Sequence, residues 1–261
     1  MKLPKILIVI PSLNSVKYIE ETLSSIVSQR YPNLEVIIQD GGSIDGTLDV
    51  IRKYAKKYPK IFSFKSKKDN GQVDAINKGL KKATGDILAY INADDIYFPG
   101  AFDEISKIYL SNSDALWFAG RGKVIDSDGS EIAKPITWYK NLLLSLNSKF
   151  NLLIANYLMQ PSVFITRQAF KKVEPFTGLP NGVVMEYGTW LKLARVSMPV
   201  VVNKTLSAFR ISQQNISSVA YKNILKEDEA IVKKFTKNKF ILFLHRINNL
   251  FRVATIKVIN K

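Results

Sequence analysis

Residues 85–95 read Gly-Asp-Ile-Leu-Ala-Tyr-Ile-Asn-Ala-Asp-Asp, and we take this stretch as the one that decides the fold. Its apolar part, residues 87–91, has the length and the branched and aromatic content of a buried strand. Asn92, Asp94 and Asp95 follow at once. Open α/β sheets bind ligands at the carboxyl ends of their strands, so the stretch predicts a central strand that carries two carboxylates to a ligand site. The alternative is a solvated turn whose aspartates cap the next helix.

The two neighbouring carboxylates, Asp94 and Asp95, repel each other unless a cation or several hydrogen-bond donors lie beside them. Mg2+ and Mn2+ prefer oxygen ligands and often bind through one or two carboxylates together with the phosphates of a substrate. A divalent cation is therefore one way to stabilise this pair.

Outward from this stretch, apolar runs of strand length alternate with helical periodicity. Further strands are predicted at residues 5–10, 34–38 and 61–64, and helices at 18–27, 47–58 and 72–83. Short links between them predict an α/β fold with a doubly wound, mostly parallel sheet. Four polar loops, at 11–14, 40–42, 69–72 and 92–95, then leave one edge of the sheet, as expected of a ligand site.

The second half of the chain has a looser pattern. It predicts a hairpin at residues 123–132, a helix at 142–153, a strand at 162–166, a helix at 186–195 and a last strand at 206–210. From residue 221 the composition shifts to helix with many lysines and few acids.

The composition excludes several classes of function. The 261 residues include no cysteine, which excludes disulfides and thiolate metal sites, and a single histidine, His245, which we expect to pack or to lie on the surface. No uncharged apolar run reaches the ~18 residues of a membrane-spanning helix, and the amino terminus does not read as a signal peptide. The net charge of +16 predicts an anionic partner: a nucleotide, lipid headgroups or nucleic acid.

The familiar phosphate-binding motifs are absent. No Gly-x-Gly-x-x-Gly follows the first strand, so a Rossmann dinucleotide site is not supported. Residues 41–47 have the outline of a P-loop but lack its lysine, which excludes an ATPase loop.

Four motifs, at residues 8–15, 29–37, 40–47 and 85–95, occur in the order found in family 2 glycosyltransferases of the GT-A fold, and the chain resembles that family. The similarity continues more loosely through residues 160–162 and 185–193. It implies a nucleotide-sugar-binding half at 1–115 and an acceptor-binding half of the same domain at 116–220. The tail at 221–261 lies outside the resemblance, and its composition predicts a basic amphipathic helical extension.

The resemblance also implies how a donor is held. Asp94 and Asp95 correspond to the end of the family's metal-binding motif, where one contacts ribose and the other a divalent cation (Mn2+ or Mg2+) on the diphosphate. The remaining residues implied for the nucleotide pocket are Pro11, Ser12, Asn14, Asp40, Lys68 and Gln72. A surface turn is the alternative for Lys68.

Glu186 is the implied general base, because the family places an acid at the start of this helix to deprotonate the acceptor hydroxyl. The alternative for Glu186 is an acid that only favours the helix amino terminus. Trp190 is a candidate for stacking on a sugar, with core packing as the alternative.

The chain departs from the family pattern at Asn92, Gly188 and Ser212, where relatives often carry acids and a histidine. The leading hypothesis is an inverting glycosyltransferase of the hexosyltransferase class. It would use a UDP-, GDP- or dTDP-sugar and a glycan or lipid-linked acceptor, in bacterial surface polysaccharide synthesis. The departures leave open a catalytically silent nucleotide-sugar-binding or scaffolding protein. A nucleic-acid-binding protein lacks any supporting motif.

Residues 239–261 combine apolar residues at helical spacing with lysine and arginine. Such a helix can lie on an anionic membrane surface, or it can pack its apolar face on the domain or on a second copy in a homo-oligomer. We accordingly expect a cytoplasmic protein, either free or attached to the inner face of the cell membrane.

Overall fold

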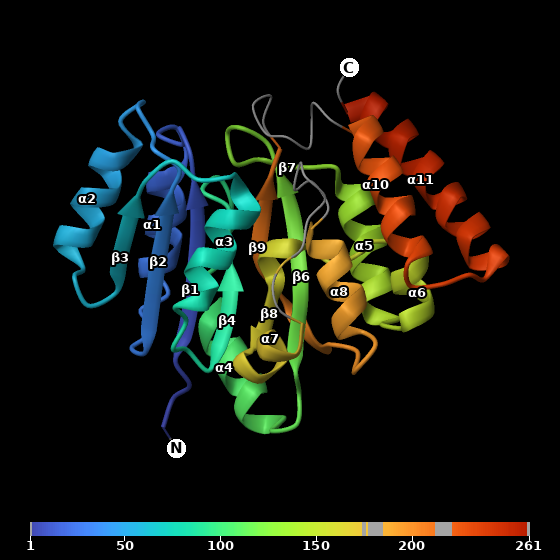
Figure 1. The fold of residues 1–261 in the computed structure, drawn as a ribbon, viewed down its shortest axis with the longest axis horizontal. Helices are drawn as coiled ribbons and strands as arrows, with labels where there is room; N and C mark the ends of the chain where they lie inside the picture. Colours follow the sequence, from blue (N-terminus) through green and yellow to red (C-terminus); the bar gives the residue numbers. More distant parts are fainter. Residues whose placement is uncertain (1, 174–175, 177–184, 212–220, 260–261) are drawn as a thin grey trace.

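The computed structural model describes residues 2–173, 176, 185–211 and 221–259, with side chains described up to residue 252 except at 221–224. Within these ranges a nine-stranded sheet has the order β3-β2-β1-β4-β8-β6-β9-β5, with β7 paired to β6. Helices cover both faces of this sheet (Figure 1). The expected α/β class with a mostly parallel sheet is confirmed.

The first four strands form the parallel part of the sheet. They are β1 (Ile6–Ser12), β2 (Leu34–Asp40), β3 (Phe62–Ser66) and β4 (Ile87–Tyr90). β1 pairs in parallel with both β2 and β4, and β2 pairs in parallel with β3. The stretch at residues 85–95 therefore does supply a central strand next to β1.

The later strands give the sheet its mixed character. They are β5 (Ile96–Tyr97), β6 (Trp117–Ile125), β7 (Glu131–Ile132), β8 (Val163–Thr166) and β9 (Val200–Arg210). β8 runs antiparallel to both β4 and β6, whereas β6 and β9 are parallel. β6 and β7 form the expected hairpin.

The core has two layers, one on each face of the sheet. Successive side chains of a strand point to opposite faces, so Ile6, Ile8 and Ile10 join one cluster while Leu7 and Val9 join the other. The first face is covered by α1 (Ile19–Val27), α2 (Thr47–Lys57) and α4 (Ala101–Ser111). The second is covered by α3 (Gln72–Lys81), α7 (Arg167–Val173) and α8 (Met185–Leu193), among others. Burial on both faces explains why β1 reads as one apolar run.

The expected single helix at 142–153 is wrong. The chain forms α5 (Lys134–Ser145) and α6 (Lys149–Ile154), with a break between them. Ser148 causes the second start, because its side chain accepts a hydrogen bond from the Asn151 backbone N–H at 3.1 Å and so caps α6.

The tail forms α10 (Tyr221–Lys233) and α11 (Lys239–Ile259). Both pack on the body of the protein: α10 lies against α8, and α11 lies against α6 and α10 (Figure 1). Ile231 and Val232 of α10 belong to the main core. In the part of the chain that the structure describes, none of the helices has the length and apolarity needed to cross a bilayer.

Candidate active site

The ends of β1 and β2 lie side by side at one edge of the sheet, with Ser12 opposite Asp40. The Gly41 N–H donates to the Ser12 carbonyl at 2.8 Å. Beyond Pro11 and Ser12, Asn14 adopts a left-handed backbone conformation (φ 48°) and its side-chain oxygen accepts from the Ile44 N–H at 3.0 Å. The loops after β1 and β2 are thus held against each other. We call the four loops at 11–14, 40–42, 69–72 and 92–95 the loop edge.

Asp40 is the centre of the second loop. Its side chain is buried and accepts four hydrogen bonds: from the Gly42 and Ser43 N–H groups at 3.0 Å, the Ser43 hydroxyl at 2.5 Å and the Ser66 hydroxyl at 2.6 Å. Three of these reach Oδ2 and one reaches Oδ1. Asp40 therefore fixes the shape of the loop, and Oδ1 keeps capacity for a further donor.

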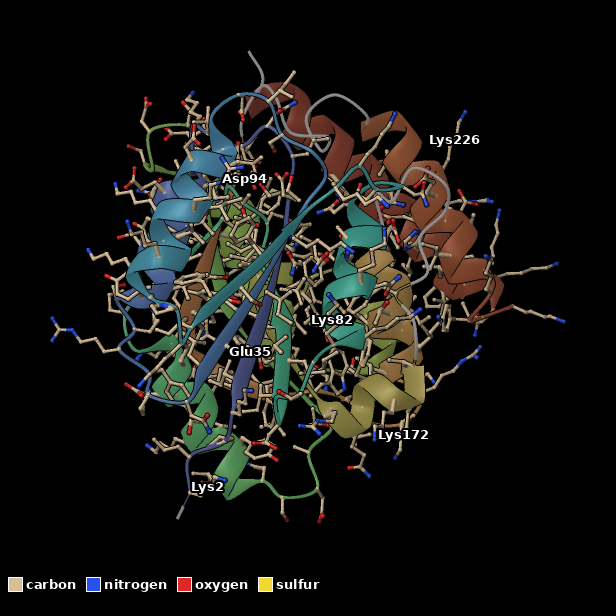
Figure 2. The ribbon with its side chains drawn as sticks, turned by 60° about the vertical axis from the view of Figure 1, so that its left-hand side comes forward. Lys2, Glu35, Lys82, Asp94, Lys172 and Lys226 are labelled. Atoms are coloured by element: carbon tan, nitrogen blue, oxygen red, sulfur yellow. The ribbon has the colours of Figure 1, made fainter. Side chains whose placement is uncertain are left out.

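The end of β4 is tied to α3 by a chain of side-chain hydrogen bonds. Gln72 Nε2 donates to Asn92 Oδ1 at 2.6 Å, and Asn92 Nδ2 donates to Asp95 Oδ2 at 3.2 Å. Asn92, which departs from the family pattern, thus orients Asp95. Figure 2 shows Asp94 toward the end of the sheet away from Lys2 at the amino terminus.

Asp95 is fully buried, and its Oδ1 accepts from the Arg210 N–H at 2.8 Å. Burial raises the pKa of Asp95 well above its usual range, and the neighbouring Asp94 adds to this, whereas Arg210 opposes it. Asp94 itself is only partly buried. The two adjacent carboxylates repel each other, and this repulsion contributes to the raised pKa of Asp95.

This pair fits a hard divalent cation in its chemistry. Asp94, Asp95 and Asn92 offer only oxygen and amide groups, which suit Mg2+ or Mn2+. Among the residues whose placement is described, no group of three or more His, Cys, Asp or Glu side chains is arranged to hold a metal. A cation here would take its other ligands from a bound phosphate group and water.

Arg210 is a structural support that the sequence pattern did not indicate. It is buried, its Nε donates to the Asp94 carbonyl at 2.8 Å, and its Nη2 pairs with Glu21 at 2.5 Å. Its guanidinium also lies over the Tyr18 ring, 4.7 Å from the centroid. Arg210 therefore fixes the backbone turn that presents both carboxylates.

Glu186 lies in the first turn of α8 and is partly buried. Burial raises its pKa to about 7, and the negative charge of Asp228 contributes, while Arg252 and Lys140 oppose the shift. The pKa of Lys140 on α5 shifts downward, to about 8, because of burial and the positive charge of Arg252. We call Lys140, Glu186, Asp228 and Arg252 the charged cluster.

The tail helices complete the charged cluster. Asp228 of α10 is buried and pairs with Arg252 of α11 at 2.6 Å. Burial raises the pKa of Asp228, and the Arg252 charge counteracts it. The charge around Glu186 therefore depends on both helices of the tail.

Tyr90 connects Glu186 with the loop edge. It is the buried last residue of β4, and its pKa is raised by burial and then by the charges of Glu186 and Asp95. One buried side chain thus lies within electrostatic reach of both acids. Gln160 holds the backbone of Tyr90 in place, because its Nε2 donates to the Tyr90 carbonyl at 2.8 Å.

Comparison with known proteins identifies the family. The model for "Glycosyl transferase family 2" matches residues 7–173, which is more than half of the chain. The chain belongs to glycosyl transferase family 2. It is accordingly a nucleotide-sugar glycosyltransferase, as the four motifs predicted.

Individual relatives agree with this assignment. The chain is 28% identical to the putative teichuronic acid biosynthesis glycosyltransferase TuaG of Bacillus subtilis, over 84% of each protein. Its fold is similar to that of the mannosyltransferase PcManGT from Pyrobaculum calidifontis, solved with GDP-Man and Mn2+ (TM-score 0.73, 17% identity, 99% of this chain and 74% of that one). It is also similar to S. aureus TarS 1–349 with UDP-GlcNAc (TM-score 0.61, 15% identity, 88% and 71% covered).

Trp190 of this glycosyltransferase lies in the core. It is 2% exposed, stacks on Trp117 at a centroid distance of 5.8 Å, and meets the edge of Phe176. A sugar has no open ring face to stack on, so the packing alternative is the one that this geometry supports.

The other residues singled out from the sequence have diverse positions. Lys68 is exposed in the loop before α3, and Gly188 is buried within α8. Ser212 lies outside the described residues. His245 is buried, and its pKa is lowered mainly by burial. Asn249 Nδ2 lies 3.0 Å from Nε2 of His245 and donates to it, while Nδ1 of His245 lies 3.0 Å from the Ile154 carbonyl and donates to that oxygen. His245 is therefore a neutral packing residue with its proton on Nδ1.

Proposed function

We propose that this glycosyltransferase moves a hexose from a nucleoside diphosphate sugar to a hydroxyl of a glycan or lipid-linked acceptor, with inversion at the anomeric carbon. The supporting observation is that the charges of both Glu186 and Asp95 raise the pKa of the buried Tyr90 side chain. A carboxyl group whose pKa is about 7 and a carboxylate pair suited to a cation are thus both within electrostatic reach of one buried side chain, which supports assigning them to one site. The similarity to a putative teichuronic acid biosynthesis enzyme supports a role in bacterial surface polysaccharide synthesis.

The loop edge would hold the nucleotide. Asp40 Oδ1 can accept an N–H of the nucleotide base, because among the described residues it receives a single hydrogen bond, from the Ser43 hydroxyl. Pro11, Ser12 and Asn14 would line the ribose from the neighbouring loop. Lys68 is exposed beside the same loops and would lie near the diphosphate, while Gln72 orients Asn92.

Asp94 and Asp95 would hold Mn2+ or Mg2+ on the diphosphate. When bound, the cation neutralises the charge that develops on the leaving nucleoside diphosphate. Arg210 and Asn92 keep the two carboxylates in place for this role.

Glu186 would accept the proton of the acceptor hydroxyl as its oxygen attacks the anomeric carbon. The new glycosidic bond forms on one face of the sugar while the bond to the diphosphate oxygen breaks on the other, which inverts the configuration. A pKa near the working pH suits this task, because the group is largely ionised and still basic enough to take a proton.

A thermal-shift screen tests the donor and the cation together. UDP-, GDP- and dTDP-sugars are added with Mn2+ and then with excess chelator, and we expect one nucleotide to raise the melting temperature in a Mn2+-dependent way. Glu186→Gln should retain this shift and lose sugar transfer, whereas Glu104→Gln on α4 should retain both. No nucleotide-dependent shift, or full transfer by Glu186→Gln, would refute the proposal.

A further inference from the structure

Three helices of the second half present large apolar side chains to solvent. Trp138 is 66% exposed, Leu250 70% and Phe240 62%. The set that we call the apolar face comprises Trp138 and Leu142 of α5, Leu146 directly after α5, Phe150 of α6, and Phe240, Phe243 and Leu250 of α11. Packing within the described chain does not account for these side chains.

α11 is apolar on two sides. Its inner side packs on the domain, where Ile241 and Leu242 contact the main core and His245 is buried. Phe240, Phe243 and Leu250 lie at spacings of three and seven residues on the outer side. The domain therefore uses one side of the helix and leaves a second apolar stripe outside.

The stripe on α5 is a neighbour of the stripe on α11. Trp138 and Leu142 lie four residues apart on one side of α5, and Leu146 continues this spacing directly after the helix ends at Ser145. The Tyr139 hydroxyl donates to Asn248 Oδ1 at 3.0 Å and so joins the two helices. α11 also packs along α6, and Figure 1 shows α5, α6 and α11 grouped at one end of the sheet.

The helices that carry the apolar face are basic and contain no acidic residue of their own. Residues 132–173 and 230–261, which include α5, α6 and α11, contain no Asp or Glu. Lys134, Lys149, Lys237 and Lys239 are exposed there, and within the described part of the chain none of them forms an ion pair. An apolar surface bordered by unpaired lysines is complementary to an anionic bilayer.

We propose that the apolar face docks this enzyme on an anionic lipid bilayer. Aromatic and leucine side chains enter the headgroup region, and the surrounding lysines bind lipid phosphates. α6, which carries Phe150, packs against α8, which carries Glu186. Docking therefore holds the base close to the headgroups and favours a lipid-linked acceptor, a consequence that rests on the proposed function.

Vesicle co-sedimentation tests the docking without any nucleotide sugar. We expect binding to vesicles that contain phosphatidylglycerol and none to pure phosphatidylcholine. The variant Trp138→Ser/Phe243→Ser/Leu250→Ser should lower partitioning at least ~10-fold. Its matched control replaces three exposed apolar residues elsewhere: Leu3→Ser/Leu110→Ser/Val196→Ser should bind like the wild type.

Charge reversal gives an independent readout. Lys149→Glu and Lys239→Glu should each weaken binding by at least about fivefold, which corresponds to about 1 kcal/mol per basic residue. Lys56→Glu on α2, at the opposite end of the sheet, should have little effect (Figure 1).

Two results would overturn the docking proposal. One is equal binding of the wild type and the triple variant. The other is a wild-type dimer in sedimentation velocity that the triple variant breaks, without binding to anionic vesicles, because the apolar face would then pair two copies. Glu186→Gln should bind vesicles normally, so a failure of the catalytic proposal remains distinguishable from a failure of docking.

Discussion

The raised pKa of Glu186 gives a quantitative prediction for the pH dependence of sugar transfer. The base works only when it is ionised, and kcat/KM reports the pKa of the free enzyme. With a pKa of about 7, roughly 10% of Glu186 is ionised at pH 6 and roughly 90% at pH 8. We therefore expect kcat/KM to fall about tenfold from pH 8 to pH 6.

An ordinary glutamate would behave differently. At the usual value of 4.5, about 97% of the side chain would already be ionised at pH 6, and the profile would be almost flat. Initial rates of transfer at low donor concentration across this pH range separate the two cases.

The charged cluster predicts how substitutions move this profile. Asp228→Asn removes a charge that raises the pKa of Glu186, so the fall in rate should move to lower pH. Lys140→Met removes a charge that lowers it, so the fall should move to higher pH. Asp103→Asn on α4 is the control and should leave the profile unchanged. A flat wild-type profile, or shifts of the same sign for both variants, would refute the reasoning.

Four further predictions concern stability and ligand binding. Because the pKa of Glu186 is raised on folding, the stability that this side chain contributes is present below about pH 4.5 and is lost as the pH rises through about 7. Glu186→Gln should therefore stabilise the protein against urea by about 1–3 kcal/mol at pH 8 and by little at pH 4.5. Asp40→Ala removes four hydrogen bonds and should cost about 2–4 kcal/mol in the same assay. Arg252→Met leaves the buried Asp228 carboxylate unpaired and should cost about 2–3 kcal/mol at pH 7, less than for a fully buried pair because Arg252 is partly exposed; an unchanged urea midpoint would contradict this. Asp94→Asn should weaken Mn2+-dependent nucleotide binding at least ~10-fold in titration calorimetry and leave Mn2+-independent binding unchanged.

The first half of the fold was predictable because its signals are local. The run at 5–10 is apolar throughout because both faces of β1 are buried, and this indicated a central parallel strand. Parallel strands place their carboxyl ends at one edge, so the convergence of Ser12, Asp40 and Asp95 followed from strand order alone.

The parts that the sequence did not predict depend on distant partners. Glu21 and Arg210, which pair beside the carboxylates, are 189 positions apart. The charged cluster brings Lys140 and Glu186 together with two residues of the tail, and no local pattern links them. The break between α5 and α6 did have a local signal, because Ser148 is a favourable first residue before a helix.

A crystal structure with a nucleoside diphosphate and Mn2+ tests the central claim most directly. We expect an N–H of the nucleotide base to donate to Asp40, the diphosphate to lie along the loop edge, and Mn2+ to bind at Asp94 and Asp95 with Glu186 facing the sugar site. A nucleotide bound elsewhere on the protein, with both aspartates free of metal and phosphate, would contradict the account.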